Sequence, residues 1–345
     1  MAGGSFCPAV AAETCSGRIV SRPAARRQGG AAQPPVPSDI GNRDGLACVS
    51  ASHGHAGPYR HYRAAISGSP QDMGDIVSGP TAARPSASAR WPLAGRQWQG
   101  ARAYQEDSFA TLDVDMAGQG APTALLMVLA DGMGGAAGGA TASRIAVEAF
   151  VGDFPGLDGA AETRFRACLD AATARLRGRE FADPQLRGMG TTVVAALYDG
   201  RRLDWLSVGD SPMWLYAAGA LERLNADHSM APVLERLVLA GELSPEAARL
   251  DRRRHMLLSA VTGRPPDLVD CGSRACCLQP GDCLLIASDG LETLTEAEIA
   301  HEIRAADGRV DAAADALDRA VRAAAGPRQD NVTFLLLSAA EPAAG

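Results

Sequence analysis

The chain contains no lysine. All 33 of its basic residues are arginine, and a Walker-type phosphate loop requires a lysine, which excludes a P-loop nucleotidase. Aromatic residues are also scarce, at 5% of the 345 residues, whereas 46% are hydrophobic and 21% are charged. These proportions are typical of a soluble globular protein with a sizeable core.

The eight cysteines form no C-x-x-C pair, so neither a zinc ribbon nor a thioredoxin-type site is indicated. None is followed six residues later by an arginine, which excludes a cysteine-nucleophile phosphatase. Their scattered spacing favours reduced thiols in the cytoplasm. The N-terminus has no signal pattern, and the longest strongly apolar run, 124–130, is too short to span a bilayer. We therefore expect a cytoplasmic protein without a membrane span.

The net charge of −7 is unevenly distributed. Residues 1–88 carry eight arginines against five acids, a charge of +3, so the remainder carries −10. Binding to a nucleic-acid backbone depends on clustered cations. The acidic region therefore argues against a nucleic-acid partner and favours a protein that concentrates divalent cations.

The composition also predicts how the chain is divided. Residues 1–88 are rich in Gly, Ala, Pro, Ser and Arg without sustained periodicity, so they bury too little apolar surface to offset the entropy of ordering. We expect a disordered extension there, one catalytic domain over 89–340 and a short tail at 341–345. No internal repeat is visible, and we expect a monomer.

Apolar periodicity predicts hairpin-connected strands interrupted by pairs of helices. Strands are expected at 107–115, 123–130, 191–198, 201–208, 213–217, 267–271, 274–278, 283–287 and 332–337. Helices are expected at 141–150, 160–179, 295–304 and 311–325, and within 230–255. Asp199-Gly200 suits a type I′ turn, and Thr295 with Glu298 makes a capping box. This order indicates an α+β fold of mainly antiparallel sheets.

Acidic residues stand where the predicted strands begin or end. They are Glu106 and Asp107 before the strand at 108–114, Asp131, Asp210 and Asp289 after apolar runs and beside a glycine, and Asp330 before the last strand. If those ends meet at one rim of a sheet, the carboxylates repel one another unless cations neutralise them. Oxygen ligands without His or Cys select Mg²⁺ or Mn²⁺ rather than zinc.

Two such cations would lower the pKa of a shared water and hold it in line with an electrophile. A phosphate ester is the matching electrophile, and its oxygens need a further cation. Arg102, four residues before Glu106, is suited to that task because arginine binds phosphate bidentately.

Two other phosphatase chemistries fit less well. Asp113-Val114-Asp115 resembles an aspartyl-phosphate nucleophile motif, but Ala117 stands where Thr or Val is needed. A calcineurin-like dimetal site requires histidines after Gly-Asp, and Gly209-Asp210 is followed by Ser211-Pro212. A water nucleophile remains.

Six motifs follow one another between residues 90 and 340. They are Arg102-Ala-Tyr-Gln-Glu106-Asp107, Asp131-Gly132-Met133-Gly134-Gly135, Met189-Gly190-Thr191-Thr192, Gly209-Asp210-Ser211, Ser288-Asp289-Gly290 and Asp330-Asn331. In this order they resemble the metal-dependent serine/threonine phosphatases, the PPM or type 2C family, in their bacterial form. The resemblance implies an α-β-β-α sandwich that hydrolyses phosphoserine and phosphothreonine in proteins with two or three Mn²⁺ or Mg²⁺ ions, opposing a Ser/Thr kinase.

The same resemblance implies a role for each matching residue. Two metals would be held by Glu106, Asp131, the Gly132 carbonyl, Asp289 and Asp330, with Asp131 bridging them. Asp107 would act mostly through metal-bound water, and Asp210 with Asp289 would hold a third, weaker ion. Arg102 would clamp the phosphate, and residues 229–258 would form the flap beside the cleft.

The chain departs from the family pattern at three positions within or next to the six motifs. Gln105 replaces an asparagine, Pro212 replaces a common arginine, and Met133 stands where eukaryotic members have a proton-donating histidine. Two rival readings stay open. One is a catalytically weak relative that binds phosphoproteins without turnover, and the other is a dimetal nuclease or small-molecule phosphatase.

Overall fold

The computed structural model describes residues 91–116, 123–134 and 137–339. The predicted disordered extension at 1–88 and the tail at 341–345 lie outside these residues. No helix in the described part of the chain is long and apolar enough to cross a membrane.

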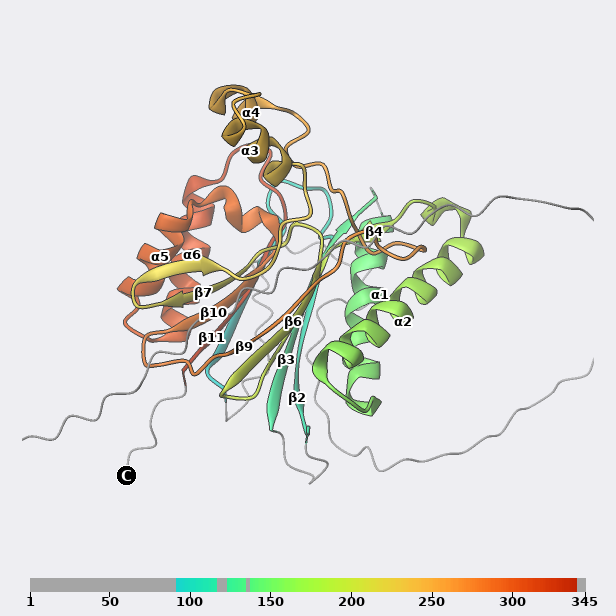
Figure 1. Cartoon of the computed structure of the whole chain (residues 1–345), viewed down its shortest axis with the longest axis horizontal. Coiled ribbons are helices and arrows are strands. Elements are labelled where there is room, and N and C mark those ends of the chain that lie inside the picture. The colour runs from blue at the N-terminus through green and yellow to red at the C-terminus, as the bar shows by residue number, and fades with distance from the viewer. Residues whose placement is uncertain (1–90, 117–122, 135–136, 340–345) are drawn as a thin grey trace, which may run out of the picture. The chain divides into compact units, whose positions relative to one another are not determined.

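Two antiparallel sheets form the centre of the described domain (Figure 1). The first has the order β1 (Leu93–Trp98), β11 (Val332–Ser338), β10 (Cys283–Ala287), β7 (Met213–Ala217) and β8 (Ala220–Arg223). The second has the order β2 (Asp107–Val114), β3 (Ala124–Met133), β5 (Val193–Tyr198), β6 (Arg202–Val208) and β9 (Asp270–Ala275). The short strand β4 (Gly190–Thr191) pairs with the end of β3.

Each sheet is covered on its outer face by a helix pair. The helices α1 (Ala137–Asp153) and α2 (Ala161–Ala182) pack on the second sheet, and α5 (Glu296–Ala305) and α6 (Val310–Ala324) pack on the first. The helices α3 (Ala231–Leu239) and α4 (Pro245–Leu250) stand apart from both layers in the connection between β8 and β9. Short 3₁₀ turns cover Phe154–Gly156, Pro184–Leu186 and Asp289–Thr293.

The buried apolar residues form three clusters, one at each interface between layers. Along β3, Leu126 and Val128 pack toward α1 and α2, whereas Leu125 and Met127 pack toward the first sheet. Successive side chains of a strand point to opposite faces, so a strand between two cores is apolar throughout. The predicted α-β-β-α sandwich of two mainly antiparallel sheets is thereby confirmed.

Two boundaries near the site differ from the prediction. β3 continues through Asp131 to Met133 instead of ending at Asp131-Gly132, because β4 and the start of β2 pair with its last residues. The helix α1 begins at Ala137, within the segment that was predicted to be a glycine-rich turn. A side chain on Gly139 would collide with Gly132 and Glu106. Close packing of the helix start on β3 therefore outweighs the low helix propensity of glycine.

Three further predictions are wrong. The strands predicted at 267–271 and 274–278 are one strand, β9, because β6 offers a continuous partner over Arg202–Ser207. The strands β1 and β8 were not predicted at all. The turn at Asp199-Gly200 is not type I′, since only Gly200 has a positive φ, 94°. Asp199 instead accepts hydrogen bonds from the backbone of Arg201 and Arg202.

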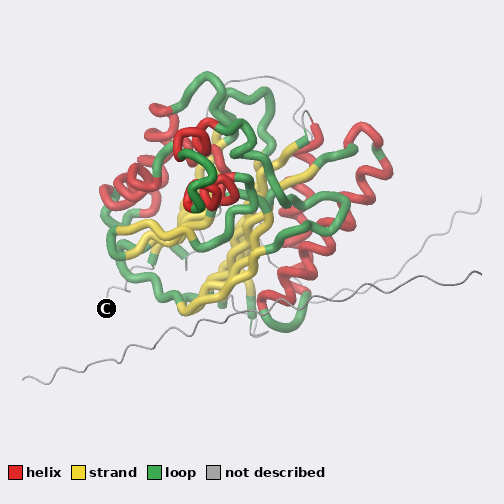
Figure 2. Tube along the Cα trace, turned by 45° about the horizontal axis from the view of Figure 1, so that its top comes forward, coloured by secondary structure: helices red, strands yellow, loops and turns green. Residues whose placement is uncertain are grey.

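The predicted capping box is confirmed, since Thr295 and Glu298 exchange both hydrogen bonds at the start of α5. Figure 2 shows long connections, drawn in green, gathered over one end of the strands.

Candidate metal centre

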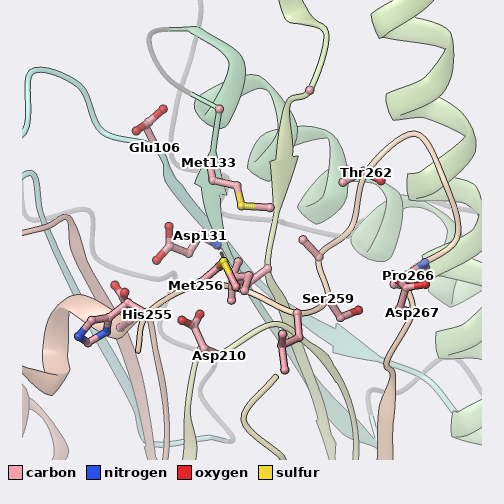
Figure 3. Close-up of a pocket in the computed structure, with 18 of the residues that line it drawn as sticks. Glu106, Asp131, Met133, Asp210, His255, Met256, Ser259, Thr262, Pro266 and Asp267 are labelled. Carbon is pink, nitrogen blue, oxygen red and sulfur yellow. Dashed lines mark hydrogen bonds between the residues drawn. The ribbon is translucent and has the colours of Figure 1, made fainter. Parts of the chain in front are cut away.

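Five of the six acidic residues singled out in the sequence line one cavity of about 900 Å³, and Asp107 does not. Its walls include Glu106, Asp131, Gly132, Asp210, Asp289 and Asp330, together with Arg102. Figure 3 shows Glu106, Asp131 and Asp210 along one side of this cavity, with Thr262, Pro266 and Asp267 on the other. Segments separated by more than 200 residues therefore contribute to one site.

Strand register explains how the carboxylates meet. In the second sheet Asp107 is the partner of Asp131, so the start of β2 lies beside the end of β3. In the first sheet Ala287 pairs with Phe334, which brings Asp289, just after β10, close to Asp330, just before β11. Antiparallel pairing thus collects the predicted acidic positions at one end of both sheets.

Asp107 connects the two sheets and does not line the cavity. Its carboxylate accepts hydrogen bonds from Ser288 Oγ at 2.8 Å and Thr333 Oγ1 at 2.7 Å, both from the first sheet. Burial raises the pKa of Asp107 to about 7, although the bonds from Thr333 and Ser288 act in the opposite direction. A role through metal-bound water therefore stays a prediction for this residue.

The backbone of Asp131 is fixed by the Thr191-Thr192 pair. Its carbonyl accepts from Thr191 Oγ1 and from the Thr192 backbone, each at 2.8 Å, and its N–H donates to Thr192 Oγ1 at 3.0 Å. Thr192 Oγ1 also lies 2.7 Å from Ser211 Oγ, next to Asp210. The sequence alone assigned no chemical role to the motif at 189–192. In the structure it positions the backbone segments that carry Asp131 and Asp210.

Burial and mutual repulsion raise the pKa values of these acids. Burial raises the pKa of Asp131 well above its usual value, and the charges of Asp107 and Asp289 add to it. Burial raises the pKa of Asp210 to about 7, with Asp289 as the next cause. Burial and then Asp330 raise the pKa of Asp289. A cation among these groups would relieve the repulsion.

The donor set fits a hard divalent cation. Three carboxylate oxygens, Glu106 Oε1, Asp107 Oδ1 and Asp289 Oδ1, are buried without a hydrogen-bond partner. A buried carboxylate oxygen without a partner costs free energy of folding unless a cation binds it. All the donors are oxygens, as Mn²⁺ and Mg²⁺ prefer.

The side chains nevertheless do not meet at a single point. Within the described residues no group of three or more His, Cys, Asp or Glu is arranged to hold one ion. Two contacts account for part of this arrangement. Arg102 pairs with Asp330, and the Asp107 carboxylate is turned toward Ser288 and Thr333. The ligand assignment therefore rests on donor chemistry and a shared cavity.

Arg102 lies at the mouth of the cavity with about half of its side chain exposed. Its hydrogen bond with Asp330 raises the pKa of its guanidinium, and Glu106 and Asp289 add to the effect. The phosphate-clamp role of Arg102 stays a prediction, because in this structure its guanidinium is paired with Asp330.

The predicted flap over 229–258 contains α3 and α4. Its end lines the cavity through His255 and Met256, and Met133 lies across the same space (Figure 3). His228, directly before this segment, is buried and accepts a hydrogen bond from the Gly209 backbone at 3.2 Å. It thereby supports the turn that carries Asp210.

Three buried polar residues beside or within the strands were given no structural role by sequence reasoning. Thr333 lies in β11, Ser288 directly after β10, and Gln329 in the connection before β11. Their hydrogen bonds tie the acidic segments together. For Thr333, a polar side chain in an otherwise apolar buried strand was the available signal, because such a group needs a partner.

Comparison with known proteins agrees with this geometry. The model of the family described as protein phosphatase 2C matches residues 95–324. The chain belongs to this family. Family membership accounts for the order of the six motifs and for the four layers of the fold.

Among its relatives in the protein phosphatase 2C family are bacterial serine/threonine phosphatases. PstP of Mycobacterium tuberculosis is 33% identical over 224 residues, which are 62% of this chain and 40% of PstP. The chain thus spans well under half of that relative. PhpP of Streptococcus pneumoniae is 30% identical, over 62% of this chain and 85% of PhpP.

A solved structure of the PstP catalytic domain in complex with two manganese ions also resembles the chain. It matches with a TM-score of 0.56 at 29% identity, over 71% of this chain and 96% of that one.

Proposed function

We propose that this chain is a protein phosphatase that hydrolyses phosphoserine and phosphothreonine with divalent cations, Mn²⁺ or Mg²⁺. The observation that carries the proposal is one cavity lined by Glu106, Asp131, Asp210, Asp289 and Asp330, with Arg102 at its mouth. A cluster of buried carboxylates beside an exposed arginine suits a cation-bridged phosphate ester.

Different acidic residues would bind different cations. Glu106, Asp131, Asp289, Asp330 and the Gly132 carbonyl would hold two cations, with Asp131 between them. Asp210 and Asp289 would hold a third ion with lower affinity. When bound, the cations supply an activated water and neutralise charge on the phosphate.

Other side chains orient the substrate and the ligands. Arg102 is suited to bind the non-bridging phosphate oxygens through its planar guanidinium. Asp107 links Ser288 and Thr333, which hold the first sheet against the second beside the cavity. Met133 contacts the cavity without a titratable group, so it cannot donate a proton to the leaving serine.

Hydrolysis of a small substrate tests this function directly. The full chain should hydrolyse p-nitrophenyl phosphate and a phosphothreonine peptide with Mn²⁺, and EDTA should abolish both activities. Silence with Mn²⁺, Mg²⁺ and other divalent metals would contradict the proposal. Binding of the phosphopeptide without turnover would instead indicate a phosphoprotein-binding module.

The comparisons with serine/threonine phosphatases support phosphoproteins as the substrate class. We propose that a Ser/Thr kinase and its targets are among them and that the chain acts as a monomer. Phosphoproteomics of a deletion strain against its parent tests the first point, because the substrates should gain phosphorylation. Light scattering of the pure chain tests the second.

A further inference from the structure

Three segments distant in sequence supply Glu106, Asp289 and Asp330, and they meet at residues 329–331. Asp330 lies between Gln329 and Asn331, residues that are 5% and 3% exposed. Neither side chain lines the cavity. Both are buried amides directly beside Asp330.

Asn331 holds the segment that carries Arg102 and Glu106. Its Nδ2 donates to the carbonyls of Gln99 at 2.7 Å and Tyr104 at 3.0 Å. Its Oδ1 accepts from the backbone N–H of Glu106 at 2.8 Å. One amide therefore fixes both ends of the 99–106 loop relative to Asp330.

Gln329 holds the segment that carries Asp289. Its Nε2 donates to the Gly290 carbonyl at 3.1 Å, and its Oε1 accepts from Thr293 Oγ1 at 2.9 Å. Its own carbonyl accepts from the Ala101 backbone at 2.9 Å, which adds a second connection to the 99–106 loop.

Two glycines let the backbones come this close. A side chain on Gly290 would collide with the Asn331 carbonyl, and one on Gly100, whose φ is +67°, would collide with the Asp330 carbonyl. The three segments are thus in backbone contact, and amide hydrogen bonds hold them there against the repulsion between their carboxylates.

We propose that Gln329 and Asn331 are positioning residues that hold Glu106, Asp289 and Asp330 within reach of shared cations. The inference rests on the proposed function, because it assigns the two amides a role in metal affinity. Each amide acts through the backbone of an acidic segment, so its removal should weaken metal binding more than it weakens the fold.

Manganese titration of the metal-free full chain tests the proposal. Gln329→Met keeps the length of the side chain and removes its hydrogen bonds, and Asn331→Ala removes all three bonds of that amide. Each should raise the calorimetric dissociation constant for Mn²⁺ roughly tenfold or more, as loss of a residue that orients metal ligands does.

Tyr198→Phe is the matched control. The Tyr198 hydroxyl is a buried partner of the Leu278 backbone at 3.3 Å, outside the cavity. Its removal should lower the melting temperature of the metal-free protein without changing Mn²⁺ affinity. If Gln329→Met and Asn331→Ala lower the melting temperature like this control and leave the dissociation constant within about twofold, the inference is wrong.

If Gln329→Met or Asn331→Ala does not fold, Thr293→Val takes its place. It removes only one partner of Gln329 and should still weaken Mn²⁺ binding about threefold, and unchanged binding would overturn the inference.

The design also distinguishes failure of the proposed function from failure of the positioning role. If the unaltered chain takes up no Mn²⁺, the proposed function itself fails. If the unaltered chain binds Mn²⁺ and the variants bind it equally well, only the positioning role fails.

Discussion

At the scale of single residues, the carboxylates of the cavity are held in a strained arrangement. Burial and neighbouring negative charges raise the pKa of Asp131 and of Asp289. Residues kept in an unfavourable environment frequently serve a binding or catalytic role at the expense of stability.

Asp131→Asn and Asp289→Asn test this trade between stability and function. Each should lower phosphatase activity by roughly a hundredfold or more, because a ligand charge is lost. Each should also raise the melting temperature of the metal-free protein, because one repelling charge is removed. Steady-state kinetics and thermal denaturation in EDTA check the two effects.

Asp315→Asn is the control for this pair. Asp315 lies exposed on α6 and accepts a hydrogen bond from the buried Arg96 of β1 at 3.0 Å. Its replacement should lower the melting temperature and spare activity. A tenth of wild-type activity retained by either cavity variant would contradict the metal assignment.

Arg102→Ala should raise the KM for a phosphopeptide more than it lowers kcat, because the phosphate loses a bidentate partner. Arg102→Lys should recover only part of the loss, since an ammonium group cannot form the planar pair. Initial-rate kinetics measure both variants. An unchanged KM in Arg102→Ala would rule out the phosphate clamp.

At the scale of secondary-structure elements, the contact between β3 and α1 shapes the site. Gly132 and Gly139 pack so closely that no side chain fits between the strand end and the helix start. The Gly132 N–H also donates to the Glu106 carbonyl at 3.1 Å, so the segment that carries Glu106 packs against the same strand end. The glycines are therefore required by packing and not by turn geometry.

Gly132→Ala should destabilise the protein by several kcal/mol or shift the end of β3, since the added carbon collides with backbone. Gly178→Ala is the control, because this exposed glycine lies within α2 and a side chain there meets nothing. It should stabilise the protein by about 1 kcal/mol. Chemical denaturation measures both, and equal effects would contradict the packing argument.

Elements with local signals were predictable from the sequence. The capping box of α5 and the strands β7, β10 and β11 needed only a few consecutive residues. β1 was missed because Arg96 interrupts its apolar pattern, and this buried arginine pairs with Asp315 in α6 and donates to the Gly95 carbonyl. A contact across 219 residues leaves no local pattern.

The site likewise has some features that local sequence predicts and others that depend on distant contacts. The acidic residues of the site were predictable because each lies at or near a strand end, three of them beside a glycine, but their surroundings were not. The pairing of Arg102 with Asp330 and the link from Asp107 to Ser288 depend on how the two sheets stack. The cytoplasmic location, the disordered extension and the individual metal ligands stay predictions.

At the scale of the whole molecule, the raised pKa values make the metal-free fold sensitive to pH. The folded state binds protons on Asp107 and Asp210 up to a pH of about 7, whereas the unfolded chain releases them near pH 4. The unfolded state thus holds fewer protons between these values, and stability falls as the pH rises through this window.

The melting temperature in EDTA should therefore be lower at pH 7.5 than at pH 6, and Asp210→Asn should reduce this difference. The buried His228, whose pKa burial lowers, acts equally in both proteins and cancels in the comparison. Differential scanning calorimetry measures the effect. A steeper decline in Asp210→Asn than in the unaltered chain would contradict it.

The account as a whole depends on the capture of divalent cations by carboxylates from both sheets. Equilibrium dialysis of the chelator-treated full chain against Mn²⁺, with metal counted by mass spectrometry, measures this most directly. We predict two tightly held ions per chain, and fewer in Asp289→Asn. No uptake at millimolar Mn²⁺, or the same uptake in Asp289→Asn, would contradict the account.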